Sequence, residues 1–319
     1  MNSDVAEAIP RLVEAGVLPP DEAPRLLRVA RGELLSVHWE LRALLYVGVL
    51  LVTGGVGLLV KENLDRIGPV AIAAGIGLAA AAALGWVVRV APPFSWGEVP
   101  SPNLAFDYML LLGVLLAAAD LAYVEVKFTP LGANWSWHLL IVAVFAALAA
   151  FRFDSRVVFS LALSTFAAWR GVSAARFGLD LWWKAGDAVR WNAIACGVLF
   201  AVLGFSLKRT GRKVHFEPVA VTLGWLLILG ALASGMGEPV WWAWTVGLLL
   251  AGLGLAAGAF LARRFSLFAF GVVAANAALS RLVLHGVLAE SLGCFWFFIT
   301  PIPVIVGLIL AQRRLKEPE

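Results

Sequence analysis

The sequence predicts an all-α polytopic membrane protein with about ten transmembrane helices. Of its 319 residues, 61% are apolar before the 31 glycines are counted, and only 14% are charged. The mean hydropathy is +0.87, whereas a soluble domain is about 45–50% apolar with glycine included and about 25% charged. So few polar side chains cannot cover a folded surface in water, and we therefore expect the chain to lie in a lipid bilayer.

Apolar runs long enough to cross a bilayer recur along the chain. A helix needs about 20 apolar residues to cross the hydrocarbon core, and Pro69 stands where a helix would start. The expected spans are residues 41–60, 69–88, 104–124, 135–151, 157–170, 191–207, 219–234, 240–262, 265–284 and 292–311. Residues 40–312 are thus predicted to form the transmembrane domain, and residues 313–319 a short cytosolic tail.

Residues 1–39 are polar and amphipathic, and they predict a short cytosolic helical hairpin. Asp4 and Glu7 have the spacing of an N-terminal cap pair. Gly16 would end the first helix, and Asp21 can cap a second one. Two roles are open for this hairpin: it docks a cytosolic partner or a second copy of the chain, or it folds against its own membrane domain. For the protein as a whole, a membrane-protein partner or a homo-oligomer is open.

The distribution of Lys and Arg predicts which side of the membrane each loop faces. With the N-terminus in the cytoplasm, 17 of these residues lie on the cytoplasmic side and 8 on the other, as the positive-inside rule requires. Both termini are then cytoplasmic. Tryptophan favours the membrane boundary, and eight tryptophans fall at the predicted outer ends of spans: Trp135, Trp137, Trp182, Trp183, Trp191, Trp241, Trp242 and Trp244.

Three stretches near the N-terminus carry a family resemblance. Residues 13–23 read VEAGVLPPDEA, residues 46–57 read YVGVLLVTGGVG, and residues 61–69 read KENLDRIGP. Over about residues 10–90 the chain resembles the bacterial membrane-protein family catalogued as domain of unknown function 2157. That family has a similar hairpin before a glycine-rich helix and an Asn-Trp-Asp-like turn, where Leu64 here replaces the Trp. The resemblance implies a helical fold in the bacterial inner membrane, but no activity and no catalytic residues.

A weaker pattern suggests an internal repeat. A shift of 149 residues aligns Gly48 with Gly197 and Gly55 with Gly204 without a gap. Two halves of five spans each would have opposite orientations, which is the inverted-repeat plan of many transporters. Chance matches in a chain so rich in Gly, Val, Leu and Ala are the alternative.

Few ionisable residues fall within the expected spans, and such residues often mark function. They are Asp107, Asp120, His138, Arg170 and Arg281. The two aspartates are 13 residues apart, or about 220° around a helix, so they do not share a face. They form either parts of a proton or cation relay or anchors that reach interfacial water.

Two further features could line a substrate path. Asn276 and Ser280 are four residues apart and so share a helical face, although they could equally bond neighbouring helices. Pro301 and Pro303 predict a break in the tenth span. Glycines such as Gly254 and Gly258, which form a small-xxx-small step, predict close helix packing.

The sequence carries no recognised catalytic motif, and neither a cofactor nor a metal site is expected. Its basic residues are scattered rather than gathered into one stripe, which argues against nucleic-acid binding. Two functional hypotheses remain. The protein binds or moves a small solute or lipid as a transporter does, or it is a non-catalytic scaffold or assembly subunit that uses its hairpin and glycine-rich faces.

Overall fold

The computed structural model describes residues 38–175, 186–286 and 300–316, together with Trp296 and residues 9–10, 12–14, 19 and 23–24. The predicted hairpin of residues 1–39 therefore lies almost wholly outside the described residues. The chain divides into two compact units, Met1–Ile67 and Gly68–Glu319. Each unit is considered by itself.

The first unit contains one long described helix, α3 (His38–Ile67), and its other described residues are short fragments before residue 25. It contains the first predicted span, residues 41–60. The Thr53 hydroxyl donates a hydrogen bond of 2.8 Å to the Val49 carbonyl one turn earlier. This bond satisfies a polar side chain within its own helix, as a hydrophobic surrounding requires.

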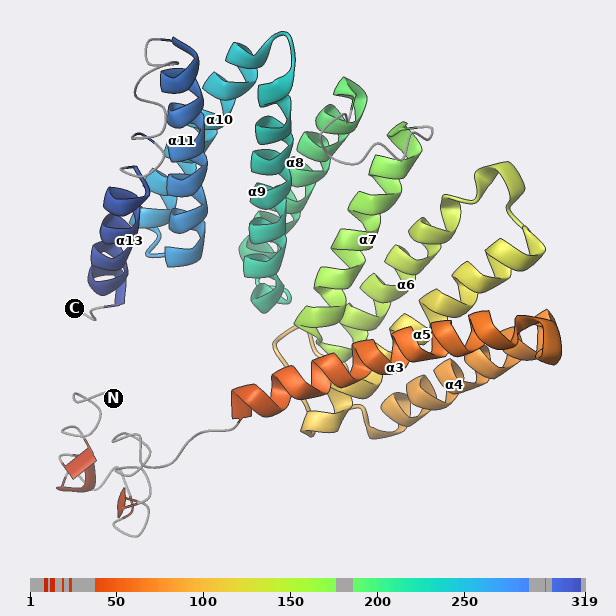
Figure 1. Cartoon of the computed structure of the whole chain (residues 1–319). Helices are drawn as coiled ribbons and strands as arrows, with labels where there is room; N and C mark the ends of the chain where they lie inside the picture. The colour runs from red at the N-terminus through yellow and green to blue at the C-terminus, as the bar shows by residue number, and fades with distance from the viewer. Residues whose placement is uncertain are drawn as a thin grey trace. The chain divides into compact units, whose positions relative to one another are not determined.

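The described residues of the second unit form helices and the connections between them, without a strand (Figure 1). Its α-helices are α4 (Pro69–Val90), α5 (Leu104–Phe128), α6 (Trp137–Phe153), α7 (Arg156–Ala175), α8 (Asp187–Thr210), α9 (Glu217–Ser234), α10 (Trp241–Leu261), α11 (Phe265–Gly286) and α13 (Pro301–Lys316). Three 3₁₀ turns, η1 (Gly132–Asn134), η2 (Val214–Phe216) and η3 (Gly235–Gly237), lie in the connections.

Local sequence signals explain several helix ends. Pro69 occupies the first turn of α4, where its missing N–H removes no helical hydrogen bond. The Asn103 side chain caps α5 by accepting a hydrogen bond of 2.9 Å from the Phe106 N–H. Gly211 ends α8 at φ +67°, a left-handed conformation that favours glycine.

Six helical segments are long and apolar enough to cross a membrane: Pro69–Val90, Ala105–Phe128, Ala188–Thr210, Val214–Gly237, Trp241–Leu261 and Phe265–Val283. Shorter apolar segments are Ala43–Val56, Trp137–Phe153 and Pro301–Gln312. The helices α3 to α11 coincide in position with the first nine predicted spans, whereas α13 overlaps only the second half of the tenth, whose first half lies almost wholly outside the described residues. The chain is thus a polytopic helical membrane protein, whereas the count of ten spans and the inverted repeat stay predictions.

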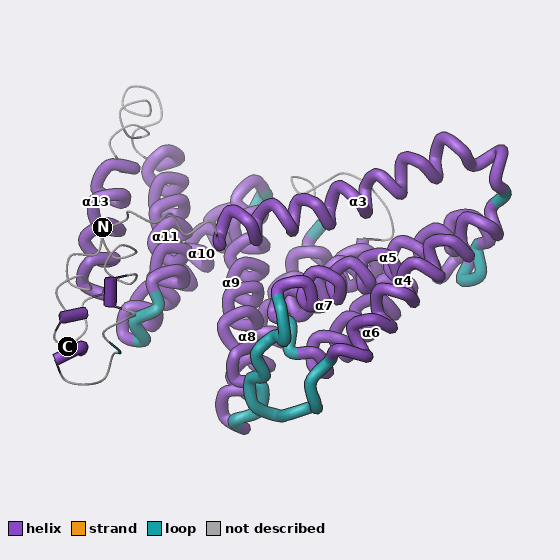
Figure 2. Tube along the Cα trace, turned by 90° about the horizontal axis from the view of Figure 1, so that it is seen from below, coloured by secondary structure: helices purple, strands orange, loops and turns teal. Residues whose placement is uncertain are grey.

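The helices of the second unit pack most closely in consecutive pairs: α4 with α5, α6 with α7, α8 with α9 and α10 with α11. The connections within the pairs are residues 91–103, 154–155, 211–216 and 262–264. Figure 2 shows the first three of these loops gathered on one side of the unit. We call the side formed by all four connections the basic end, because Arg89, Arg152, Arg156, Lys208, Arg209, Arg212, Lys213, Arg263 and Arg264 lie there.

Glycine allows two of these pairs to approach closely. A Cβ on Gly197 of α8 would lie 2.5 Å from the Gly224 carbonyl oxygen of α9. A Cβ on Gly252 of α10 would likewise lie 2.8 Å from the Gly271 carbonyl oxygen of α11. Backbone therefore packs on backbone at both crossings, the arrangement for which small residues are used in membranes.

Gly254 and Gly258 do not take part in such packing. A Cβ on either would meet nothing within 4 Å among the described residues. The expectation that this small-xxx-small step packs against another helix is therefore wrong for the described part of the chain. The packing glycine of α10 is Gly252, which points to the opposite side because two residues turn a helix by about 200°.

Candidate functional site

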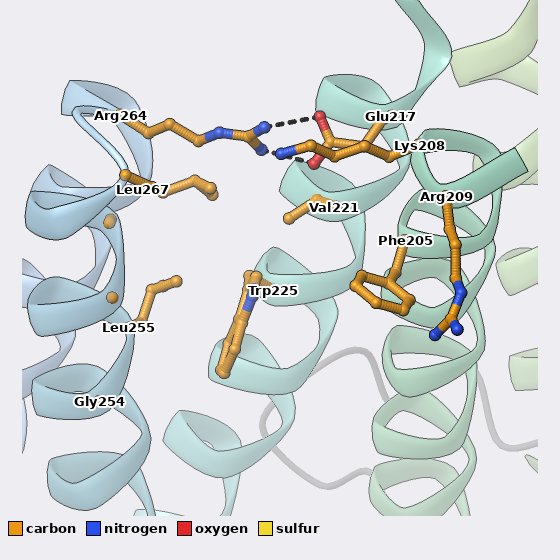
Figure 3. Close-up of a pocket in the computed structure, with 13 residues that line it drawn as sticks. Phe205, Lys208, Arg209, Glu217, Val221, Trp225, Gly254, Leu255, Arg264 and Leu267 are labelled. Carbon is orange, nitrogen blue, oxygen red and sulfur yellow. Dashed lines mark hydrogen bonds and ion pairs between the residues drawn. The ribbon is translucent and has the colours of Figure 1, made fainter. Parts of the chain in front are cut away.

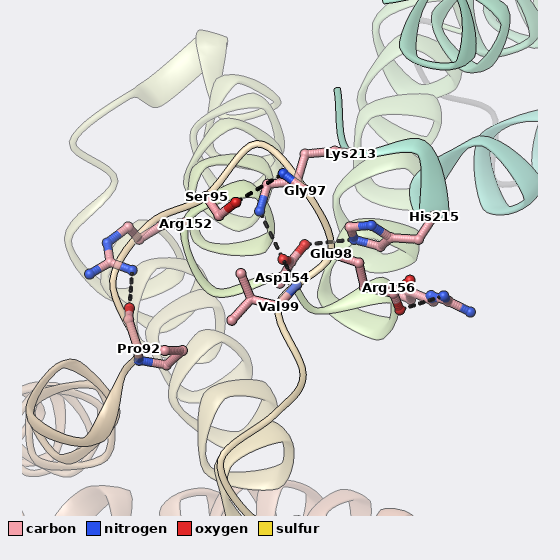
Figure 4. A network of polar contacts seen from close by, with 10 residues as sticks. All are labelled: Pro92, Ser95, Gly97, Glu98, Val99, Arg152, Asp154, Arg156, Lys213 and His215. Carbon is pink, nitrogen blue, oxygen red and sulfur yellow. Dashed lines mark hydrogen bonds and ion pairs between the residues drawn. The ribbon is translucent and has the colours of Figure 1, made fainter. Parts of the chain in front are cut away.

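The connections at the basic end are held together by a buried polar cluster centred on Asp154 (Figure 4). Asp154 Oδ2 lies 2.9 Å from Lys213 Nζ and accepts a hydrogen bond of 2.7 Å from the Val99 N–H. His215 Nε2 lies 2.6 Å from Asp154 Oδ1, but the two groups are not aligned as a hydrogen bond. We therefore treat this approach as a close polar contact. The side chains of Asp154 and Lys213 are only 3% and 1% exposed.

Further contacts surround the cluster. The Lys213 N–H donates to the Trp96 carbonyl at 2.7 Å, and its ammonium lies 5.0 Å from the centre of the Phe94 ring. An exposed ion pair of 2.7 Å joins Arg156 to Glu98 and contributes little, because water screens it. Loops 91–103, 154–155 and 211–216 therefore meet at one end, although two helices separate each from the next.

Tryptophan and arginine gather at the opposite end, which we call the tryptophan end. Arg190, whose side chain is 1% exposed, forms an ion pair with Glu238. Arg281 donates a hydrogen bond of 3.0 Å to the Met236 carbonyl. The rings of Trp191 and Trp244 lie 5.6 Å apart. These contacts join the start of α8, the connection 235–240 and the end of α11.

A cavity of about 480 Å³ lies between α7, α8 and α9. We call it the central cavity. Its walls are mainly Ala, Leu, Val, Phe and Gly side chains, and its polar lining residues are Ser164, Arg190, Asn192, Cys196 and Ser234. A mainly apolar pocket with a few convergent polar groups is typical of small-molecule sites.

Asn192 is fixed in the wall of this cavity. Its side-chain N–H donates to the Ala188 carbonyl at 2.8 Å, and its Oδ1 accepts a hydrogen bond of 2.5 Å from Arg170. The Arg170 guanidinium also lies 5.6 Å from the Trp169 ring centre. Arg170 therefore borders the cavity through Asn192, and it is the only predicted ionisable residue brought to a described cavity.

The structure places the other predicted residues elsewhere. Asp107 accepts a hydrogen bond of 2.7 Å from the Ser101 hydroxyl at the start of α5. The Asp120 carboxylate packs over Gly77 of α4, where a Cβ would lie 3.1 Å from Asp120 Oδ2. His138 stacks on Trp135 with ring centres 5.5 Å apart. The described contacts do not bring Asp107 and Asp120 together.

The candidates in the C-terminal region have structural partners as well. The Ser280 hydroxyl accepts a hydrogen bond of 3.1 Å from Trp296 Nε1. Asn276 is half-buried in α11. Pro301 and Pro303 lie in the first turn of α13, where a proline fits a helix without loss of a hydrogen bond.

A second, larger recess of about 720 Å³ opens at the surface near the basic end. We call it the basic groove. It lies between α8, α9, α10 and α11, and Figure 3 shows Lys208 directed towards the Arg264–Glu217 pair. Arg264 binds Glu217 through two hydrogen bonds of 2.7 and 2.8 Å. These bonds raise the pKa of Arg264 above its ordinary value, so the guanidinium stays charged.

Sequence analysis missed Asp154, Lys213, Arg190, Glu217 and Arg264. All five lie at span ends or in connections; the three basic residues entered only the count of Lys and Arg, and the two acidic residues did not enter the prediction. Their partners lie far away in the chain, so no local spacing shows the pairing. The sequence signal for such ion pairs is a short segment between two spans that contains both acidic and basic residues, as residues 211–217 do.

A comparison with known proteins finds a family whose model matches the N-terminal part of the chain, which includes α3 to α6. The family model "Predicted membrane protein (DUF2157)" matches residues 10–159. No curated protein and no solved structure matches the chain. The match confirms the family resemblance and extends it from residue 90 to the start of α7. Residues 10–159, slightly less than half of this integral membrane protein, are therefore similar to the DUF2157 family of predicted membrane proteins.

Proposed function

We propose that this protein binds a small, mainly apolar solute or lipid in the central cavity and moves it within the membrane, as a transporter does. The observation that carries the proposal is the cavity of about 480 Å³ between α7, α8 and α9. Its volume is within the range of about 300–1,000 Å³ that ligand pockets occupy.

The polar lining indicates the chemistry of the ligand. Arg190 is held by Glu238, and Asn192 is held by Arg170, so the strongest charges near the cavity already have partners. Ser164, Cys196 and Ser234 offer neutral groups. An uncharged ligand with one or two hydrogen-bonding groups fits this wall better than an ion does, because burying an unpaired charge is costly.

The proposal includes ten spans, with both termini in the cytoplasm of a bacterial cell and the basic end on the cytoplasmic side. The grouping of connections supports it, since loops 91–103, 154–155 and 211–216 share one end. This end carries nine of the 16 arginine and lysine residues that the structure describes in the second unit, as expected for a cytoplasmic surface. The proposal assigns no catalytic step to the protein.

Thiol labelling tests whether the central cavity is open to water. Cys196 lines the cavity and is 4% exposed. In a Cys294→Ser background, N-ethylmaleimide should label Cys196 faster than it labels a cysteine placed at Val202, an exposed position of the same helix. The reason is that maleimide reacts with thiolates, which do not form in hydrocarbon. The Val202→Cys control also carries Cys196→Ser.

A cavity-filling variant makes this test specific. Gly230 lines the cavity, and a Cβ there would meet no atom within 4 Å. Gly230→Leu should therefore fill the cavity without a clash and slow the labelling of Cys196 by about tenfold or more. Equal labelling with and without the leucine, or no labelling of Cys196 at all, would contradict a solute-binding cavity.

The alternative function is a non-catalytic scaffold. One observation favours it: Gly254 and Gly258 form an exposed strip on α10 that no described helix covers. Small residues of this kind allow a helix of another chain to approach closely. Under this alternative, cysteines introduced at the strip would form cross-links between chains, and the Gly230→Leu variant would keep full function.

A further inference from the structure

The basic groove carries more positive charge than its own acidic residue can balance. Glu217 is already engaged by both terminal nitrogens of Arg264. Lys208 and Arg209 also line the groove, are exposed, and form no ion pair with a carboxylate in the described part of the chain. Figure 3 shows Lys208 turned towards the Arg264–Glu217 pair and Arg209 extending along α8 beside Phe205, so the groove has two cations beyond the one that Glu217 balances.

Below these cations the groove is apolar. Phe205 and Val221 lie nearest the charges, and Trp225 and Leu255 line the deeper part (Figure 3). Gly254 and Gly258 continue the apolar wall along α10, and no atom occupies the space where their Cβ atoms would be. A smooth strip of this kind leaves room for a hydrocarbon chain beside the helix.

We propose that the basic groove binds a phospholipid with an anionic headgroup. Lys208 and Arg209 turn towards its phosphate when it binds, and one acyl chain runs along Trp225 and the Gly254–Gly258 strip. Basic pockets between membrane helices suit such headgroups. The site is separate from the central cavity, since the two have no lining residue in common. It is therefore independent of the proposed transport function.

Other occupants fit less well. A free phosphate ion would use the cations but leave the apolar wall empty. A zwitterionic phospholipid brings its own positive charge and gains less from Lys208 and Arg209. A helix from a second copy would cover the glycine strip, but it would not explain why Lys208 and Arg209 line the groove. The four cases differ in their response to headgroup, chain and charge.

Quenching of Trp225 by brominated lipid tests the proposal. The full-length protein is placed in nanodiscs of phosphatidylcholine that contain increasing fractions of a lipid with brominated chains. This lipid is either phosphatidylglycerol or phosphatidylcholine. The contribution of Trp225 is the difference in quenching between the wild type and Trp225→Phe. Equal quenching of Trp225 should need an about tenfold lower fraction of brominated phosphatidylglycerol than of brominated phosphatidylcholine, as expected for two cations near an anionic headgroup.

Two variants, a change of salt and two control variants separate the parts of the site. Lys208→Gln with Arg209→Gln should remove the preference for phosphatidylglycerol, and so should high salt. Gly258→Leu should block the chain and remove the quenching of Trp225 by both lipids. Arg89→Gln changes an exposed cation at the same end outside the groove, and Gly85→Leu changes an open glycine of α4. Both controls should behave as the wild type does.

Several outcomes would overturn the proposal. One is equal quenching of Trp225 by the two brominated lipids. Another is full competition by glycerol 3-phosphate, which would show a site for phosphate alone. A third is a change from dimer to monomer in Gly258→Leu with unchanged lipid preference, which would assign the strip to a second copy of the chain. Loss of transport would not bear on the groove, because the readout is lipid contact.

Discussion

At the scale of single residues, Asp154 has the largest expected effect on stability. It is buried, and Lys213, His215 and the Val99 N–H all approach its carboxylate. Removing one partner of a buried ion pair leaves the other charge uncompensated, which costs about 3–5 kcal/mol. The basic end therefore depends on this one carboxylate more than on any exposed pair.

Asp154→Asn isolates the charge from the backbone conformation. Asp154 has φ +64°, and asparagine tolerates this left-handed region. We expect the free energy of unfolding in detergent to fall by about 3 kcal/mol or more because Lys213 loses its counter-charge. Asp107→Asn is the matched control, since Asp107 bonds only an exposed serine. A similar small change in both variants would contradict a stabilising cluster.

The sequence could indicate the type of these residues but not their pairing. Charges between apolar runs were expected, and they occur there. The contact between Asp154 and Lys213 depends on how two hairpins pack side by side, and apolar periodicity contains no such information. Arg170 was found because it interrupts an apolar run, whereas Arg190 was missed because it lies just before one.

At the scale of helices, glycines two residues apart in α10 have opposite roles. Gly252 forms the backbone crossing with α11, whereas Gly254 faces the basic groove. Glycine content alone predicted close packing in this helix, and the structure assigns it to only one side. The sequence could not decide between the two sides, because apart from Thr245 every residue of this span is apolar or glycine.

A pair of alanine substitutions tests this assignment. In Gly252→Ala the new Cβ would lie 2.8 Å from both the Ala275 amide nitrogen and the Gly271 carbonyl oxygen, and overpacking of this kind costs about 1–3 kcal/mol. Gly254→Ala adds the same methyl group in open space and should leave the stability unchanged. Thermal unfolding in one detergent compares the two variants. Equal unfolding temperatures would show that the crossing is looser than described.

At the scale of the whole molecule, the pairing of helices organises the second unit. Four pairs close at the basic end, and this direction repeats from pair to pair. Composition was enough to predict the class of fold and the position of most helices. It could not predict which helices pair or where cavities form, since both depend on side-chain packing between spans.

The proposed orientation has a direct test by cysteine labelling in intact cells. In a background without Cys196 and Cys294, Arg212→Cys reports on the basic end, and Asn134→Cys reports on the tryptophan end. A membrane-impermeant maleimide should label Asn134→Cys in intact cells, and Arg212→Cys only after permeabilisation. Both positions are exposed in the described structure. The reverse pattern would place the basic end outside the cytoplasm and reject the positive-inside assignment.

The cluster around Asp154 also constrains how the protein is made. Lys213 and His215 follow α7 and α8 in the chain, so the ribosome has not yet added them when α6 is complete. The nascent carboxylate must stay hydrated at the membrane surface until α8 has been inserted. Until then the earlier hairpins are held by their apolar surfaces and by loop contacts such as the one from the Val99 N–H to Asp154. The ionic contact with Lys213 forms later, and it joins segments that the translocation machinery releases one after another.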